Sequence, residues 1–275
     1  MNWKYFYFSK RFFFVLLFQF CLYGSAQESN KLSPGQTITI KLDSLPPCLV
    51  ELKSGKKVEA VMTATLPENY NSEGKFPVLL FLQGGEGGNG GNNNDASFFS
   101  DNKDFVALSL PLYKKTLNPS GIDIYINQND FKYLADIYEK AFNLLRKEIP
   151  NLSDSDWVVG GFSNGAHSIA GILKSQKLRK LFKYFILAEG GSEISSIPNK
   201  CRAILFVGEN SIYGKGMVVK DGKVIGFPNQ FGSLKKKNVD FVPMIGIGHD
   251  FPEKYKIEAK EWLKAQLQKD NNKEK

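Results

Sequence analysis

The sequence predicts an α/β fold in which a mostly parallel central sheet is covered by helices on both faces. Short, continuously apolar segments alternate along the chain with longer segments of helical periodicity. Strands buried on both faces of a parallel sheet read as uninterrupted apolar runs, and their alternation with helices implies right-handed crossover connections. A Gly-x-Ser-x-Gly pentapeptide, residues 161–165, lies between one such strand and one such helix.

Residues 1–26 have the layout of a secretory signal peptide. Three basic residues, the last of them Arg11, precede an apolar run over 12–23, and the small residues Gly24-Ser25-Ala26 offer a cleavage site. The run is shorter than the roughly 20 residues that a membrane-spanning helix needs. We therefore expect a secreted or periplasmic protein without a stable membrane span, whose mature part, 27–275, is a single domain.

The charge of the chain does not indicate a nucleic-acid partner. The formal net charge is +8, and removal of the signal peptide lowers it to +5 because three basic residues leave. The remaining lysines are spread along the chain, without a basic helix, an aromatic stacking platform or a zinc-ligand spacing. We expect no nucleic acid, metal ion or other cofactor. The mature part keeps Cys48 and Cys201, either as one disulfide or as two free thiols.

The chain begins with an expected N-terminal β extension over 27–57. Within it, residues 37–42 alternate between polar and apolar, as a half-buried strand does, and Pro46-Pro47 end the segment. A second β segment follows at 58–66. The central strands are expected at six apolar runs: 76–82, 105–110, 157–160, 184–188, 203–207 and 239–245.

Two long amphipathic helices accompany these strands. The first is capped by Asn129 or Asp130 and ends before Pro150. An insertion that contains glycine and lysine, 211–236, precedes the last strand, and we expect it to border the active site and influence specificity. The final helix is opened by Pro252, and its apolar face contains Tyr255, Ala259, Trp262 and Leu263.

The Gly-x-Ser-x-Gly motif predicts a nucleophilic serine at Ser163. The β-favouring segment 157–160 precedes the motif, and a helix-forming segment, 166–174, follows it. In a strand–turn–helix of this kind the serine occupies a strained turn, and side chains at Gly161 and Gly165 would collide with neighbouring backbone. The serine Oγ then projects above the sheet, next to a helix N-terminus that favours a developing negative charge.

A serine nucleophile needs a base, and the chain contains only two histidines. His249 lies in a loop after the last strand and before the last helix, where an open α/β sheet places its chemistry. We therefore expect His249 to be the base. His167 follows Ser163 by four residues on the same helix, and we expect it to point along the helix and to have a packing role.

The remaining member of a catalytic triad is an acid that orients the histidine. In this architecture the chain order is serine, acid, histidine, with the acid after a late strand. The run 203–207 is followed by Glu209, which is the first choice for the acid. Glu189, at the end of the preceding strand, and Asp221, inside the insertion, remain alternatives.

The glycine-rich segment after the first central strand is the expected oxyanion hole. One backbone N–H from Gly84 or Gly85 and the N–H of Asn164 would bind the oxyanion. The same segment contains a Gly-x-Gly-x-x-Gly match at 85–90. No apolar helix is expected directly after it, so the sequence does not predict a dinucleotide site.

These motifs resemble those of the α/β-hydrolase superfamily. The chain is most similar to the secreted esterase branch, which includes esterase D-like proteins, feruloyl and acetyl xylan esterases and polyhydroxyalkanoate depolymerases. The resemblance implies the α/β-hydrolase fold, with Ser163 as nucleophile, His249 as base and the oxyanion donors named above. It covers about residues 58–267 and rests on four segments: 66–70, 76–85, 160–166 and 248–250.

Two positions depart from the pattern of this family. Gln83 stands where many relatives have histidine, and Ser211 stands three residues after Gly208, where relatives commonly carry aspartate. The second departure leaves the acid open. The resemblance implies a hydrolase that cleaves carboxylic esters, of a small molecule or linked to a polysaccharide, through an acyl-enzyme. A peptidase or amidase on the same fold and a non-catalytic binding protein are the rival hypotheses.

Overall fold

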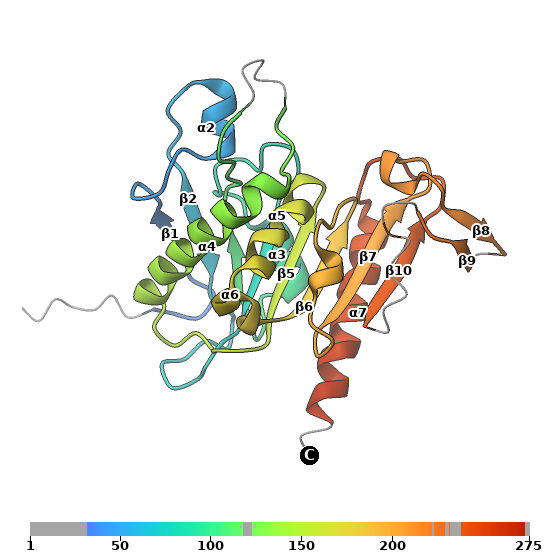
Figure 1. Ribbon diagram of the computed structural model, residues 1–275. Helices are drawn as coiled ribbons and strands as arrows, with labels where there is room; N and C mark the ends of the chain where they lie inside the picture. Colours follow the sequence, from blue (N-terminus) through green and yellow to red (C-terminus); the bar gives the residue numbers. More distant parts are fainter. Residues whose placement is uncertain (1–31, 118–122, 222, 229–230, 232–237, 273–275) are drawn as a thin grey trace, which may run out of the picture. The chain divides into compact units, whose positions relative to one another are not determined.

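The computed structural model describes residues 32–117, 123–221, 223–228, 231 and 238–272 (Figure 1). The chain divides into two compact units, and the second, Ser33–Lys275, contains every element described below. The expected signal peptide lies outside the described residues. Within the described part of the chain, no helix is long and apolar enough to cross a membrane.

An eight-stranded, mostly parallel sheet forms the centre of this unit, which confirms the expected fold class. The strand order is β1-β2-β4-β3-β5-β6-β7-β10; β2 is antiparallel to both of its neighbours, and the strands from β4 to β10 run parallel. The eight strands are β1 (Thr37–Lys41), β2 (Val61–Thr65), β3 (Val78–Leu82), β4 (Val106–Ser109), β5 (Trp157–Phe162), β6 (Phe182–Ala188), β7 (Arg202–Gly208) and β10 (Val239–Met244).

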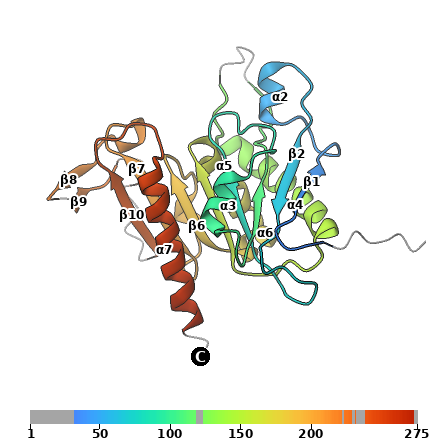
Figure 2. The ribbon, with the colours of Figure 1, turned by 180° about the vertical axis from the view of Figure 1, so that it is seen from behind.

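Helices cover both faces of the sheet. The face turned to the viewer in Figure 1 carries α4 (Gln128–Glu148), α5 (Asn164–Lys174) and α6 (Gln176–Leu181). The opposite face, seen in Figure 2, carries α3 (Asn94–Ser100) and the terminal helix α7 (Glu253–Asn271). The two long helices were both expected from the sequence, and both bury an apolar stripe against the sheet.

Aromatic side chains fill the space between the sheet and each helix layer. On the side of α3, Phe99 stacks on Phe81 of β3, with ring centroids 5.3 Å apart. On the side of α4, Trp157 makes edge contacts with Phe142 and Phe182, each at 5.5 Å. Burying one such side chain contributes about 1.5–3 kcal/mol. The strands that carry the candidate site are therefore packed firmly from both sides.

The first turn of α4 is capped by Asn127, two or three residues before the cap residues expected from the sequence, Asn129 or Asp130. The Asn127 side chain accepts from the N–H of Asn129 at 3.0 Å, and the Asp130 carboxylate accepts from the N–H of Asn127 at 3.1 Å, which forms a capping box. Asp130 also pairs with Lys114 at 3.1 Å, and both side chains are buried. Lys114 further donates to the carbonyl of Tyr125, so the loop before α4 is fixed to the helix.

Five short elements depart from the expected organisation. The helix α2 (Leu49–Ser54) lies within the expected β extension, and α3 follows the glycine-rich segment, where no helix was expected. The described part of the insertion contains the 3-10 turn η2 (Ile212–Gly214) and a hairpin, β8 (Val218–Lys220) and β9 (Lys223–Gly226). Elements of one or two turns are too short to show a helical period, which explains these differences.

The two cysteines among the described residues are free thiols. Cys48 and Cys201 are both buried and unpaired, so the disulfide that the sequence left open is not formed. Burial raises the pKa of each thiol. Both therefore stay protonated and weakly nucleophilic near neutral pH.

Candidate active site

Ser163 occupies the turn between β5 and α5. The strand ends at Phe162 and the helix begins at Asn164. Between them Ser163 has φ 51° and ψ −119°, a conformation that costs a non-glycine residue roughly 1–3 kcal/mol. Its backbone N–H donates to the carbonyl of Ala188 at 2.8 Å. The strained turn thus stays attached to the neighbouring strand β6.

The two glycines of the motif allow this turn to form. A Cβ at Gly165 would lie 2.1 Å from the carbonyl oxygen of Leu82, and one at Gly161 would lie 2.7 Å from the backbone nitrogen of Ala166. Neither contact is possible for a real side chain. The collisions expected from the sequence are therefore present, and they explain why both flanking positions are glycine.

The carboxyl ends of four parallel strands meet at this edge of the sheet. In register, Phe162 of β5 lies opposite Ala188 of β6, and Gly208 of β7 lies opposite Met244 of β10. Glu189 directly follows β6, and His249 lies in the loop between β10 and α7. Parallel strands of matched register bring these residues together although they are far apart in the sequence.

Ser163, His249 and Glu189 form a continuous hydrogen-bonded relay. The Nε2 atom of His249 lies 2.8 Å from Ser163 Oγ, and its Nδ1 atom lies 3.0 Å from Glu189 Oε2. An ionised carboxylate only accepts, so Nδ1 carries the proton and Nε2 is the acceptor for the serine hydroxyl. The imidazole is held in the tautomer that can take the proton of Ser163.

The structure does not place Glu209, the first choice for the acid, against His249. The Glu209 side chain is exposed, and its carboxylate accepts from the N–H of Gly246 at 3.0 Å. Asp221 is exposed as well and follows β8. Glu189, one of the two alternatives expected from the sequence, contacts His249 instead.

Glu189 reaches the histidine across the end of β7. A Cβ at Gly208 would lie 2.2 Å from the carbonyl oxygen of Gly248, in the loop that carries His249, and 3.2 Å from Glu189 Oε1, so glycine at this position lets that loop approach the strand end. Ser211, three residues after Gly208, has a short side chain without a carboxylate, and its hydroxyl forms a hydrogen bond with Glu189. The chain order of serine, acid and histidine holds, but the acid lies one strand earlier than expected.

The Glu189 carboxylate is completely buried, with 0% of its side chain exposed. Burial is the largest influence on this group, and it raises the pKa of Glu189 above its ordinary value. Three donors oppose burial by favouring the ionised form: the N–H of Gly208, the hydroxyl of Ser211 and the ring of His249. The carboxylate is thus supported by neighbouring donors, without direct contact with solvent.

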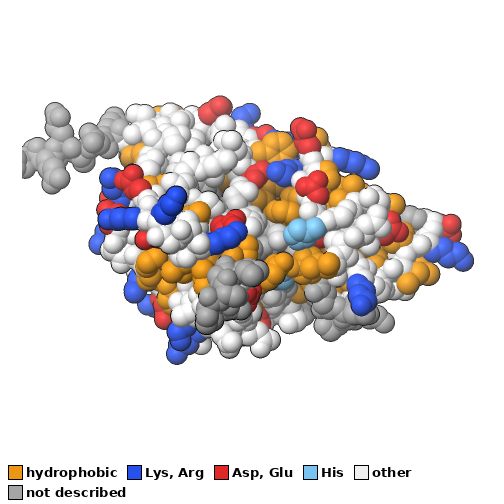
Figure 3. Space-filling model, turned by 90° about the horizontal axis from the view of Figure 1, so that it is seen from above, with side chains coloured by type: hydrophobic (Ala, Val, Ile, Leu, Met, Phe, Trp, Pro, Cys, Tyr) orange, Lys and Arg blue, Asp and Glu red, His pale blue; other side chains and the backbone are white. Residues whose placement is uncertain are grey.

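The imidazole of His249 is held between aromatic side chains and remains open to solvent. Its ring centroid lies 5.2 Å from that of Phe162 and 5.5 Å from that of Tyr213. The His249 side chain is 42% exposed, whereas Ser163 is 7% exposed. Figure 3 shows a histidine side chain at the surface of the molecule among hydrophobic side chains. A substrate can therefore approach the relay from this side.

The side chain of Asn164 connects two loops next to the relay. Its Nδ2 donates to the carbonyls of Gly85 at 2.9 Å and Ile124 at 2.8 Å, and its Oδ1 accepts from the N–H of Ile126 at 2.9 Å. Its backbone N–H belongs to the first turn of α5 and has no acceptor within the helix. Gly84 packs against Phe162, whose ring would lie 2.7 Å from a Cβ at that glycine. The three expected oxyanion residues therefore lie around Ser163.

His167 points away from the serine hydroxyl, as the sequence analysis expected. Its Nδ1 lies 2.7 Å from Ser192 Oγ, and its Nε2 lies 3.1 Å from the Tyr213 hydroxyl. Sequence reasoning did not identify Tyr213, Ser192 or the side chain of Asn164 as parts of the site. No local pattern marks them, because each acts through residues from another part of the chain.

Side chains and backbone N–H groups make up the site. Among the residues that the structure describes, no group of three or more His, Cys, Asp or Glu side chains is arranged to hold a metal ion.

Comparison with known proteins identifies the fold. No protein-family model matches the sequence, and no curated protein matches it. Among solved structures, dienelactone hydrolase from Anabaena variabilis matches with a TM-score of 0.51 and 15% identity, over 84% of this chain and 97% of that chain. The chain has the α/β-hydrolase fold.

Other α/β-hydrolase neighbours carry different activities in their names. FphF, a fluorophosphonate-binding serine hydrolase of Staphylococcus aureus, matches with a TM-score of 0.50 and 12% identity, over 84% of this chain and 98% of that chain. A putative dipeptidyl aminopeptidase IV from Bacteroides ovatus matches with a TM-score of 0.50 and 11% identity, over 85% of this chain and 36% of that chain. This chain spans about a third of that protein. Esterases match as well.

Proposed function

We propose that this chain is a serine hydrolase that cleaves carboxylic esters through an acyl-enzyme. One observation carries the proposal: the relay from Ser163 through His249 to Glu189, with steps of 2.8 and 3.0 Å. Ser163 occupies a strained turn, the Nε2 atom of His249 faces its hydroxyl, and a buried acid bonds to the other ring nitrogen. Together these groups make a nucleophile and its base. The serine hydrolase FphF among the structural neighbours supports the serine-hydrolase part of this proposal.

The first half of the reaction acylates the serine. As Ser163 Oγ attacks the ester carbonyl carbon, its proton passes to Nε2 of His249, and Glu189 stabilises the imidazolium that forms. The carbonyl oxygen becomes an oxyanion, which the N–H of Asn164 and an N–H of Gly84 or Gly85 would stabilise. When the carbon–oxygen bond to the alcohol breaks, the alcohol oxygen takes the proton from His249 and departs.

The second half releases the acid by the same steps with water as the nucleophile. His249 takes a proton from water, whose oxygen attacks the acyl carbon. The bond to Ser163 Oγ then breaks, and the serine recovers its proton from the imidazolium. The exposed edge of His249 gives water access to this step.

The rival outside enzymes, a non-catalytic binding protein, depends on the absence of an acid from the histidine. The contact between Glu189 and His249 counts against it. The rival within enzymes, a peptidase or amidase, uses the same three groups, so only the substrate separates it from an esterase. The proposed substrate is an ester of a small molecule or one linked to a polysaccharide.

Hydrolysis of p-nitrophenyl acetate and butyrate by residues 27–275 tests the proposal, with Ser163→Ala beside the wild-type protein. We expect turnover that is lost in the variant while circular dichroism shows both proteins folded. No turnover of either ester, together with cleavage of aminoacyl p-nitroanilides, would favour the amidase. No turnover of any of these substrates by the folded wild-type protein would overturn a hydrolytic function.

We also propose that the protein is exported and that residues 1–26 are removed. The basis is the basic, apolar and small-residue layout of this segment. Expression of the full sequence with a secretion pathway, followed by mass spectrometry of the exported protein, should show cleavage after Ala26. An intact protein retained in the cytoplasm would contradict the proposal.

A further inference from the structure

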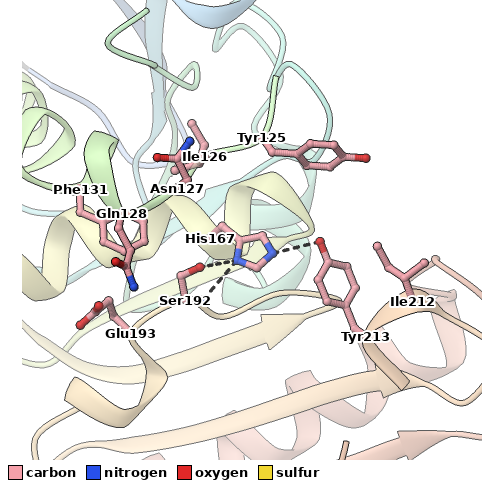
Figure 4. A pocket seen from close by; sticks show the side chains of 10 residues that line it. All are labelled: Tyr125, Ile126, Asn127, Gln128, Phe131, His167, Ser192, Glu193, Ile212 and Tyr213. Atoms are coloured by element: carbon pink, nitrogen blue, oxygen red, sulfur yellow. Dashed lines mark hydrogen bonds between the residues drawn. The ribbon is translucent and has the colours of Figure 1, made fainter. Parts of the chain in front are cut away.

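A pocket of about 500 Å³ opens beside the relay (Figure 4). This volume lies within the range of small-molecule sites and far exceeds the needs of an acetyl group. Tyr125 and Ile126 approach it from the loop before α4, and Ile212 and Tyr213 approach it from the segment after β7. The ten lining residues are Tyr125, Ile126, Asn127, Gln128, Phe131, His167, Ser192, Glu193, Ile212 and Tyr213.

Three contacts connect this pocket to the catalytic relay. The backbone N–H of His167 donates to the carbonyl of Ser163 at 3.0 Å, so the two residues share the first turn of α5. The ring of Tyr213 lies 5.5 Å from the ring of His167 and 5.5 Å from that of His249. The N–H of Ile126 bonds to the side chain of Asn164, the residue after the serine. A group bound in the pocket would therefore lie next to the reacting carbonyl.

His167 presents an uncharged surface to the pocket. The backbone N–H of Ser192 donates to its Nδ1 at 3.3 Å, so Nδ1 is unprotonated and the ring proton is on Nε2, which donates to Tyr213. Burial lowers the pKa of His167 to about 4. The ring is consequently neutral at neutral pH and cannot attract an anionic substituent.

The remaining walls favour apolar ligands. Five of the ten lining residues are aromatic or branched aliphatic: Tyr125, Ile126, Phe131, Ile212 and Tyr213. No lysine or arginine is among the lining residues that the structure describes. Glu193 is the acidic member, and it is paired with Lys174 at 3.0 Å. A carboxylate or phosphate on the ligand would thus face an acid and no cation.

We propose that this pocket binds an uncharged, ring-sized apolar group carried by the ester, and that it makes such esters the preferred substrates. The inference rests on the proposed function, because it assigns a substrate class to the same site. The group can belong to the acyl part or to the alcohol part of the ester, since both lie next to the reacting carbonyl. Tyr213 and Ile212, from the start of the expected insertion, supply one wall.

Matched esters test the proposal, with acid release followed in a pH-stat. Methyl acetate is the small reference, methyl phenylpropanoate carries a ring on the acyl side, and phenylethyl acetate carries a ring on the alcohol side. We expect kcat/KM for one of the two ring esters to exceed that for methyl acetate by at least about tenfold. The ester that is preferred identifies the side. A carboxylate added to its ring should abolish the preference.

A pocket-filling variant shows whether the preference comes from this pocket. Gln128→Trp adds volume at the lining of the pocket, and Lys140→Trp adds the same side chain at an exposed position about three turns further along α4. In Gln128→Trp we expect the ratio of kcat/KM for the ring ester to that for methyl acetate to fall at least about tenfold. In Lys140→Trp this ratio should stay at the wild-type value.

Two results would overturn the inference while leaving the proposed function intact. One is hydrolysis of all three esters without a preference for either ring ester. The other is an equal decrease for ring ester and methyl acetate in Gln128→Trp. A folded wild-type protein that hydrolyses none of the esters would instead overturn the proposed function, and this inference with it.

Discussion

The hydroxyl of Ser211, after β7, donates a hydrogen bond to the carboxylate of Glu189, after β6. The same hydroxyl oxygen accepts the N–H groups of Tyr213 and Gly214, each at 3.1 Å. A hydroxyl has a single proton, and these two contacts leave that proton for the carboxylate. In the family that this chain resembles, the acid is commonly found at this position. Here the position holds a neutral serine, whose hydroxyl donates to a carboxylate that follows the adjacent strand.

Glu189→Gln should lower kcat by roughly 10³- to 10⁴-fold. Glutamine keeps the size of the side chain, but its uncharged amide cannot stabilise the imidazolium as a carboxylate does, and its NH2 group can donate to Nδ1 and favour the wrong tautomer. The control is Glu209→Gln, whose side chain is exposed and bonds only to the N–H of Gly246 in the described contacts. We expect its kcat within about twofold of wild type. The reverse ranking in steady-state assays would return the acid role to Glu209.

Ser211→Ala should shift the acid limb of the kcat/KM profile to higher pH. Activity requires an ionised Glu189, and loss of the hydroxyl removes a donor that lowers the pKa of this carboxyl. The carboxyl then takes up its proton at a higher pH than in the wild-type protein. Ser211→Thr retains the hydroxyl and should restore the wild-type limb. A limb that stays in place in Ser211→Ala, even with a lowered melting temperature, would limit Ser211 to a structural role.

Ser163→Gly should be more stable than Ser163→Ala by about 1 kcal/mol. Both variants lack the nucleophile, but alanine keeps a Cβ at φ 51° whereas glycine adopts that angle without strain. Urea denaturation of the two variants measures the difference. Equal midpoints would show that the turn stores no strain at this residue.

Asn164→Asp should lower kcat by roughly 10²-fold. A carboxylate can still accept from the N–H of Ile126, but it cannot donate to the carbonyls of Gly85 and Ile124. The loop that carries the oxyanion donors would lose its fixed position beside Ser163. Asn94→Asp, an exposed substitution at the first residue of α3, is the matched control and should leave kcat unchanged. A similar kcat in both variants would contradict a positioning role for Asn164.

His167 should make stability fall between pH 6.5 and about 4. Its pKa is 6.5 in the unfolded chain and about 4 in the folded protein, so the unfolded state binds more protons in this window. The contribution is fully present above pH 6.5 and is lost as the pH falls, by roughly 3 kcal/mol in total. Urea unfolding of His167→Gln from pH 7 to pH 4.5 should show a shallower decline than wild type. Parallel declines would show that His167 is not the titrating group.

Local patterns were sufficient to predict the sheet, Ser163 and His249. The continuous apolar run of β3 is typical of a buried strand, and the collision at Gly161 occurs within the strand–turn–helix itself, whereas the collision at Gly165 is with Leu82 of β3. The position of His249 follows from the end of the last strand. Apart from the contact between Gly165 and Leu82, these features depend on residues close together in the chain, so the sequence predicts them directly.

The acid and the pocket depend on contacts between distant segments. Glu189 reaches His249 because β6, β7 and β10 are in register and because glycine at 208 lets the loop before His249 approach the end of β7. In the sequence, Ser211 indicates that the usual acid is absent, but it does not indicate that Glu189 takes its place. Tyr213 lies between His167 and His249 because η2 packs against the end of β7. Such relationships are set by the register of the sheet and not by any single segment.

The location of Glu189 directly after β6 also affects how the protein can vary. The hairpin of β8 and β9, which follows Gly214, contributes none of the three hydrogen-bonded side chains Ser163, His249 and Glu189. Changes in the length or composition of this hairpin are therefore uncoupled from bond cleavage. This hairpin is the position where a loop can be lengthened or replaced without removing a member of the relay.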